Sequence, residues 1–117
     1  MRQARNYQAG LAAEESVLRS YIAAGYAMLA RRCRGAHGEI DLVLKRGDDV
    51  VFVEVKKSRS FDAALIRLGA AQIGRIFETA HEFLGAQPKG LLTEARFDLA
   101  LVNAHGEVRI MENALMG

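Results

Sequence analysis

The chain has 117 residues, 50% of them hydrophobic and 26% charged, and carries a formal net charge of +2. A chain of this length fits one domain, residues 1–117, which buries enough surface to fold without a disulfide or a structural metal. With Cys33 as its one cysteine it cannot form an internal disulfide, which favours a reducing compartment. Because no apolar run has the length of a signal peptide or a membrane span, we expect a cytoplasmic protein without a membrane partner.

The net charge is too small to indicate a nucleic-acid partner, but its distribution is uneven. Residues 1–34 contain six arginines against two glutamates. This N-terminal excess of positive charge could bind phosphates. An ordinary solvated surface explains it at least as well.

The expected elements alternate between helical and strand patterns. The first is a helix over about residues 7–24, and Gly25 ends it. Its apolar residues are Leu11, Leu18, Tyr21 and Ile22. Strands are expected at 26–32, 40–45, 50–56, 95–103 and 108–111, with one long helix that ends near residues 84–85. The order α-β-β-β-α-β-β predicts an α/β fold, a mixed β-sheet flanked by helices.

The two central strands form a hairpin whose register depends on the length of its loop. A two-residue loop, Gly47-Asp48, suits a type II′ turn and brings apolar residues opposite one another, with Asp41 opposite Glu54. A three-residue loop would place Leu42 opposite Glu54 and mix the two faces of the sheet. A four-residue loop would keep the faces but place Asp41 opposite Lys56. We favour the two-residue loop.

In the favoured register two carboxylates lie side by side, with their Cβ atoms roughly 5 Å apart. Their repulsion at an effective dielectric constant near 20 is about 3 kcal/mol. A divalent cation held by Asp41 and Glu54 would remove this conflict, and Mg²⁺ is usually held by one or two carboxylates with waters and substrate phosphates. The alternative is that both charges are simply solvated at exposed strand ends.

Lys56 shares a face with Glu54, because strand residues two apart point to the same side. A cation at this position can hold an attacking water or stabilise charge on a phosphate. Glu39 is expected on the same face, opposite Lys56, either as its salt-bridge partner or as a further acidic group.

Glu14 falls within the apolar stripe of the first helix, where a charged side chain needs a partner or a metal. A position at the margin of the stripe, from which the carboxylate reaches solvent, is an equally good explanation.

Several segments together resemble the YraN-like family of bacterial proteins, within the PD-(D/E)xK nuclease superfamily and related to Holliday-junction resolvases. The matching segments are Gly10–Glu14, Gly38–Val43, Phe52–Lys56, Arg96–Asp98 and Glu112–Ala114. The resemblance implies a restriction-endonuclease-like three-layer fold. It also implies Asp41, Glu54 and the Val55 carbonyl as metal ligands and Lys56 as the water-positioning cation, with Glu14 and Gln72 matching helix residues of the family.

The chain departs from the family pattern at three positions. Ile40 replaces proline, Ser58 stands where relatives usually have arginine, and Ala71 where they usually have lysine. The metal ligands are therefore complete, whereas the groups that would bind phosphate are reduced in number.

These observations predict a Mg²⁺- or Mn²⁺-dependent endonuclease that acts on DNA, with branched DNA as one candidate substrate. The residues expected to bind nucleic acid are Arg31, Arg32, Arg34, Arg59 and Gln72. A two-fold junction substrate would call for a homodimer. The alternative is a non-catalytic nucleic-acid-binding module with the same fold.

Overall fold

The computed structural model describes residues 2–115, with side chains from residue 9 onward. The elements are α1 (Arg2–Ala23), β1 (Ala27–Arg34), β2 (Glu39–Arg46), β3 (Asp49–Lys57), α2 (Phe61–Ile66), α3 (Ala70–Gly85), a 3-10 turn η1 (Gly90–Leu92), β4 (Ala95–Val102) and β5 (Val108–Met111). The predicted α/β class and element order are confirmed. No helix among the described residues combines the length and the apolar character needed to cross a bilayer.

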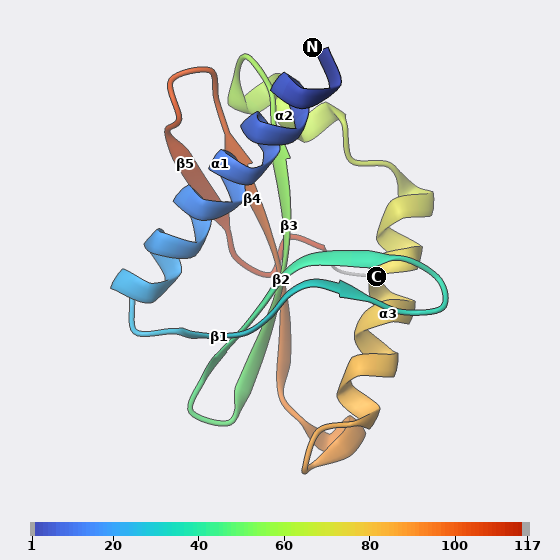
Figure 1. Cartoon of the computed structure of the whole chain (residues 1–117). Helices are drawn as coiled ribbons and strands as arrows, with labels where there is room; N and C mark the ends of the chain where they lie inside the picture. The colour runs from blue at the N-terminus through green and yellow to red at the C-terminus, as the bar shows by residue number, and fades with distance from the viewer. Residues whose placement is uncertain (1, 116–117) are drawn as a thin grey trace.

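The five strands form one mixed sheet in the order β1-β2-β3-β4-β5, and β3 and β4 are its parallel pair. Figure 1 shows α1 on one face of this sheet and α3 on the other. Each face therefore buries its own core. The α1 side includes Val17, Leu18, Tyr21, Leu44, Val51 and Val53, and the opposite side includes Val43, Phe52, Ala64, Ile76, Ala80 and Leu99. This three-layer architecture is compatible with a restriction-endonuclease-like fold.

The register predicted for the β2–β3 hairpin is confirmed. Leu42 lies opposite Val53 and Lys45 opposite Val50, so the loop contains two residues. Gly47 has a φ of 63°, a left-handed conformation that glycine adopts without a steric penalty. The turn therefore fixes which side chains of the two strands share a face.

Two expectations about helices are wrong. The single long helix is two helices, because the chain leaves helical geometry between Ile66 and Ala70, where Gly69 has the extended backbone of an N-cap. Ile22 is 53% exposed and not part of the core, because the buried stripe of α1 runs through Ala13, Glu14, Val17, Leu18 and Tyr21.

Buried Asp98 connects α1, β4 and the segment after β5. Its carboxylate accepts hydrogen bonds from the Tyr21 hydroxyl at 2.7 Å, from the Arg96 guanidinium at 2.8 and 2.9 Å, and from the Asn113 N–H at 2.9 Å. Asp98 itself is fully buried. A buried charge with this many donors is stabilised, but removal of the charge leaves several donors unsatisfied.

We therefore predict that Asp98→Asn lowers the free energy of unfolding by about 3–5 kcal/mol, the range for breaking a buried ion pair. Urea denaturation followed by circular dichroism measures this change. Asp48→Asn is the matched control, because Asp48 forms an exposed ion pair with Lys89 at 3.1 Å and exposed pairs contribute little. Equal losses in the two variants would contradict the central role of Asp98.

Candidate functional site

The alternation of side chains between the two faces of the sheet is broken in β2 at Asp41. Leu42 and Leu44 belong to the core on the α1 side, as residues two apart in a strand should. Ile40, two residues before Leu42, instead belongs to the core on the α3 side. The regular alternation of side chains is therefore broken at Asp41.

The hairpin separates at the same place. The pairing of β2 with β3 ends at Leu42 and Val53, one pair before the expected Asp41–Glu54 pair. The Asp41 carboxylate accepts a hydrogen bond from the Val55 N–H at 2.7 Å. The Asp41 side chain thus replaces the β2 backbone as the partner of β3 at this position. The two strands are separated here, although their backbones pair from Leu42 and Val53 to the turn.

Glu54, the residue after the last pair, is buried, and its hydrogen-bonding capacity is only partly satisfied. Its Oε1 atom accepts a hydrogen bond from Gln72 at 3.1 Å and lies 3.5 Å from the Lys56 ammonium. Its Oε2 atom is buried and has no hydrogen-bond partner among the described residues. Burial, followed by the negative charge of Asp41, raises the pKa of Glu54 to about 8, and Lys56 opposes the shift.

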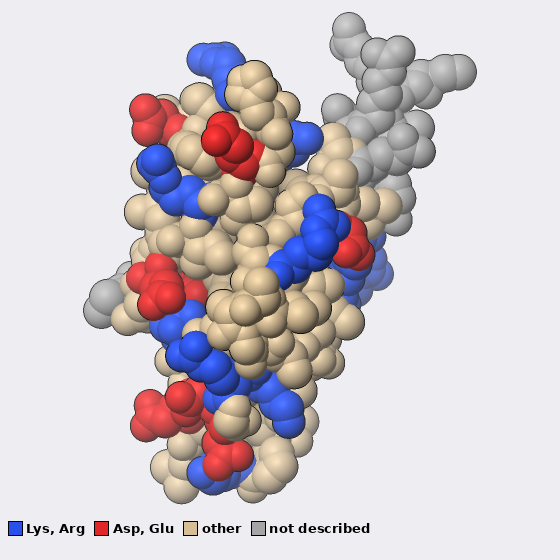
Figure 2. Space-filling model, turned by 90° about the vertical axis from the view of Figure 1, so that its left-hand side faces the viewer, with Lys and Arg blue, Asp and Glu red and all other residues tan. Residues whose placement is uncertain are grey.

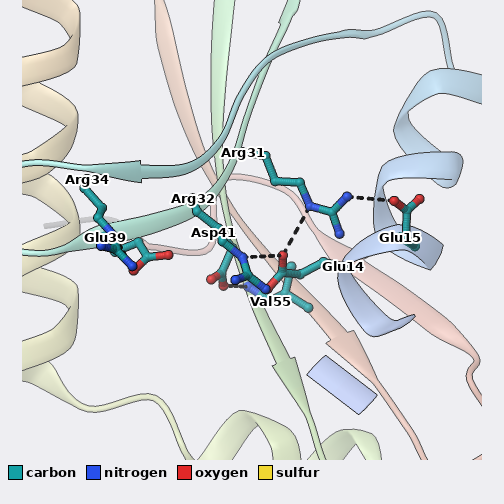
Figure 3. A network of polar contacts seen from close by, with 8 residues as sticks. All are labelled: Glu14, Glu15, Arg31, Arg32, Arg34, Glu39, Asp41 and Val55. Carbon is teal, nitrogen blue, oxygen red and sulfur yellow. Dashed lines mark hydrogen bonds and ion pairs between the residues drawn. The ribbon is translucent and has the colours of Figure 1, made fainter. Parts of the chain in front are cut away.

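Glu14 enters the site from α1 and is 9% exposed, as the buried interpretation of its position predicts. Figure 3 shows its carboxylate between two arginines of β1, with Arg31 at 3.4 Å and Arg32 at 3.6 Å from the same oxygen. Burial and the charge of Asp41 raise the pKa of Glu14, and the two arginines lower it. Glu14, Asp41 and Glu54 are therefore electrostatically linked, with Asp41 acting on both glutamates.

The backbone of Arg32 explains how two consecutive strand residues reach one carboxylate. Successive side chains of a strand normally point to opposite faces. Arg32 has a φ of 54°, in the left-handed region, which costs a residue other than glycine about 1–2 kcal/mol. This conformation lets both guanidinium groups face Glu14.

The residues present fit a divalent cation with oxygen ligands. Asp41 and Glu54 offer two linked carboxylates, and the unpartnered Glu54 oxygen is a free acceptor at the same place. The Val55 carbonyl is the third ligand that the sequence predicts. Among the described residues no group of three or more His, Cys, Asp or Glu side chains is placed to hold a metal ion. Mg²⁺ does not require such a group, because it commonly keeps several waters.

Arginines that the sequence analysis expected to bind phosphate form ion pairs with glutamates in the structure. Arg31 pairs with Glu15 at 2.7 Å as well as with Glu14, and Arg34 pairs with Glu39 at 3.4 Å. Arg59 is exposed. The proposed contact of Glu39 with Lys56 is wrong, because the separation of β2 from β3 moves Glu39 to the β1 side, where Arg34 lies opposite it.

Two basic residues beside the site were not among those predicted from the sequence. A pocket of about 490 Å³ adjoins Glu14 and Lys56, and Lys57 and Arg67 also line it. Lys57 directly follows a predicted site residue, which is a usable signal. Arg67 reaches the pocket only because the helical segment breaks after α2, which the sequence pattern did not indicate.

The raised pKa of Glu54 predicts that the metal-free protein loses stability as the pH rises. A carboxyl group whose pKa increases on folding is protonated in both states below its ordinary value of 4.5, so its contribution is complete there. That contribution is lost as the pH rises through about 8. We expect Glu54→Gln, which resembles the neutral form, to flatten this dependence and to be the more stable protein at pH 8 by up to a few kcal/mol.

Thermal melting in EDTA between pH 5 and pH 9 measures this difference. Glu94→Gln, at an exposed glutamate, is the control and should follow the wild-type curve. If Glu54→Gln has the wild-type pH dependence, burial of Glu54 does not affect its titration.

Comparison with known proteins identifies relatives over nearly the whole chain. The family model of "Uncharacterised protein family UPF0102" matches residues 13–102. A UPF0102 protein of Roseobacter denitrificans is 57% identical over 93% of this chain and 84% of its own length. Those of Ruegeria pomeroyi and Cereibacter sphaeroides are 54% and 52% identical, over 97% and 93% of this chain and 92% and 93% of their own lengths. The chain belongs to the UPF0102 family, the YraN family that its motifs resemble.

Proposed function

We propose that this protein is a Mg²⁺- or Mn²⁺-dependent endonuclease that hydrolyses phosphodiester bonds of DNA. The observation that carries the proposal is the buried, unpartnered Glu54 oxygen beside the charge of Asp41. Such an arrangement is unfavourable for folding unless a proton or a cation offsets the two charges, and perturbed carboxylates of this kind are concentrated at functional sites. A pocket lined by Glu14, Val55 and Lys56 adjoins this position.

The metal would be held by Asp41, Glu54 and the Val55 carbonyl. The chemistry supplied there is stabilisation of negative charge on the phosphate and activation of a water molecule. Asp41 is held in place by its hydrogen bond to the Val55 N–H, so the ligands from the two strands keep a fixed separation. Gln72 orients Glu54 from α3.

Lys56 is suited to position the attacking water. Its side chain is 15% exposed and its ammonium lies 3.5 Å from Glu54, at the wall of the pocket. An ammonium carries three donors, so it can hold a water as well as the carboxylate. It can also stabilise negative charge that develops on the phosphate during hydrolysis.

Glu14 positions other residues of the site and does not act on the reacting groups directly. It fixes Arg31 and Arg32 beside Asp41, where two positive charges offset the negative charge of the acidic residues.

The second candidate function is a non-catalytic nucleic-acid-binding module. The ion pairs of Arg31, Arg32 and Arg34 favour it, because these arginines are already bound to acidic side chains. Figure 2 shows basic and acidic side chains intermingled over the face in view, without a large patch of one sign. A weak overall field limits affinity for DNA but does not affect local chemistry.

Metal binding is tested by Asp41→Asn. The asparagine oxygen can still accept the Val55 hydrogen bond, while the charge next to Glu54 is lost. In EDTA we expect the variant to melt at a higher temperature than wild type, because it lacks the repulsion between Asp41 and Glu54. The gain in stability should be at most a few kcal/mol. Wild-type protein should gain about 3 kcal/mol of stability at a metal concentration of about a hundred times Kd. The variant should lose this response, and an unchanged response would place any bound ion elsewhere.

Catalysis is tested by Lys56→Ala with Mg²⁺ and with Mn²⁺. We expect DNA cleavage to fall by at least about a hundredfold, as for the loss of a group that acts in the transition state. DNA binding should change little, and Lys89→Ala, which removes an exposed lysine, should cleave like wild type. Linear, single-stranded and junction DNA should be compared at low salt. If none is cut with either metal although binding persists, the non-catalytic module is the better account.

A further inference from the structure

The pocket beside the candidate site lies where three elements converge. Figure 1 shows the N-terminal half of α1 and helix α2 meeting beyond the end of β3. The last residues of β3 form one wall, Ala9, Gly10 and Ala13 of α1 form another, and Arg67 after α2 contributes to the third. Glu14 and Lys56 belong both to this pocket and to the site, so the two are continuous.

The cations of this pocket differ from the other arginines near the site. Arg31, Arg32 and Arg34 each have a carboxylate partner. In the described part of the chain, no carboxylate forms an ion pair with Lys57 or Arg67. Arg67 donates one N–H to the Lys57 carbonyl at 2.7 Å, which fixes its guanidinium and leaves further donors. The pocket therefore has positive charge available for an anionic ligand.

Gly10 leaves space for a ligand beside α1. It lies in the interior of α1, where glycine destabilises a helix relative to alanine. A Cβ atom placed on Gly10 would meet no heavy atom of the described residues within 4 Å, and its φ is not in the left-handed region. Neither packing nor backbone geometry therefore requires glycine here. The missing side chain leaves room for a ligand to lie against the helix at this wall of the pocket.

We infer that this pocket binds the phosphodiester backbone of a single nucleic-acid strand. Lys57 and Arg67 bind its phosphates, and Gly10 lets the strand lie against α1 and lead to Lys56. A pocket of about 490 Å³ has the size of a site for a drug-sized ligand, which one or two nucleotides match and a base-paired duplex does not. This inference deepens the proposed function and names its substrate as unpaired DNA, such as a single strand or the splayed arm of a branch.

The test is equilibrium binding of fluorescein-labelled oligothymidine in EDTA, followed by anisotropy. Because no metal is present, the result does not depend on whether the protein cleaves DNA. We expect Lys57→Ala and Arg67→Ala each to raise Kd about threefold to tenfold and to reduce the slope of log K against log salt by about 0.7. Lys57 uses only its backbone carbonyl in the hydrogen bond with Arg67, so its variant keeps that contact. Lys89→Ala is the control for loss of one positive charge.

A second variant separates binding from folding. Gly10→Leu should raise the melting temperature, because leucine favours a helix, and should weaken oligothymidine binding more than tenfold by filling the pocket. Gly74→Leu is the matched control, because Gly74 lies in the interior of α3, has equally open space around its Cβ position and is not part of this pocket. It should leave binding unchanged.

Competition with unlabelled DNA completes the test. Oligothymidine and forked duplexes should displace the probe at lower concentrations than a blunt duplex of the same length. The inference is overturned if the blunt duplex competes equally well, or if Lys57→Ala and Gly10→Leu bind like Lys89→Ala and Gly74→Leu. If the wild-type protein does not cleave DNA although these binding effects are observed, the result counts against the proposed function alone.

Discussion

The hydrogen bond from the Val55 N–H to the Asp41 carboxylate determines the arrangement of the whole candidate site. Up to Leu42 and Val53 the two central strands pair through their backbones, and beyond that pair the side chain of Asp41 takes over. An aspartate can make this contact only where the strands part, so the acidic group and the separation arise together. Glu54 is buried beside this separation and contacts Gln72 of α3 and Lys56.

The site concentrates negative charge that the fold alone does not need. Glu14 and Glu54 both have raised pKa values, in each case through burial first and the charge of Asp41 second. The compensation is local: two arginines on Glu14 and one lysine on Glu54. Part of it requires Arg32 to adopt a left-handed backbone, which is a further cost. Costs of this kind, gathered at one place beside a pocket, are typical of functional sites and not of surfaces that only need to be soluble.

Features that depend on strand alternation and turn chemistry are predicted well from the sequence. The hairpin register results from the pairing of apolar residues around Gly47-Asp48, whereas the helical pattern left two interpretations of Glu14 open and the structure shows it buried. Prediction fails where one residue breaks a repeating pattern. The broken alternation of β2 at Asp41, the positive φ of Arg32 and the break between α2 and α3 are each decided by tertiary contacts. Arg67 was not predicted near the site for the same reason, because no local pattern indicates that the chain returns to the site after α2.

A formal net charge of +2 is compatible with nucleic-acid binding when the free cations are local. Interactions between exposed charges are largely screened beyond about 8–10 Å at physiological ionic strength, so distant residues add little to the binding of one phosphate. The arginines of β1 are bound to acidic partners, whereas Lys57 and Arg67 line the pocket without one among the described residues. Basic residues near this site therefore divide into those that hold the carboxylates in place and those available to a substrate. That division, more than the total charge, determines which substitutions should affect folding and which should affect binding.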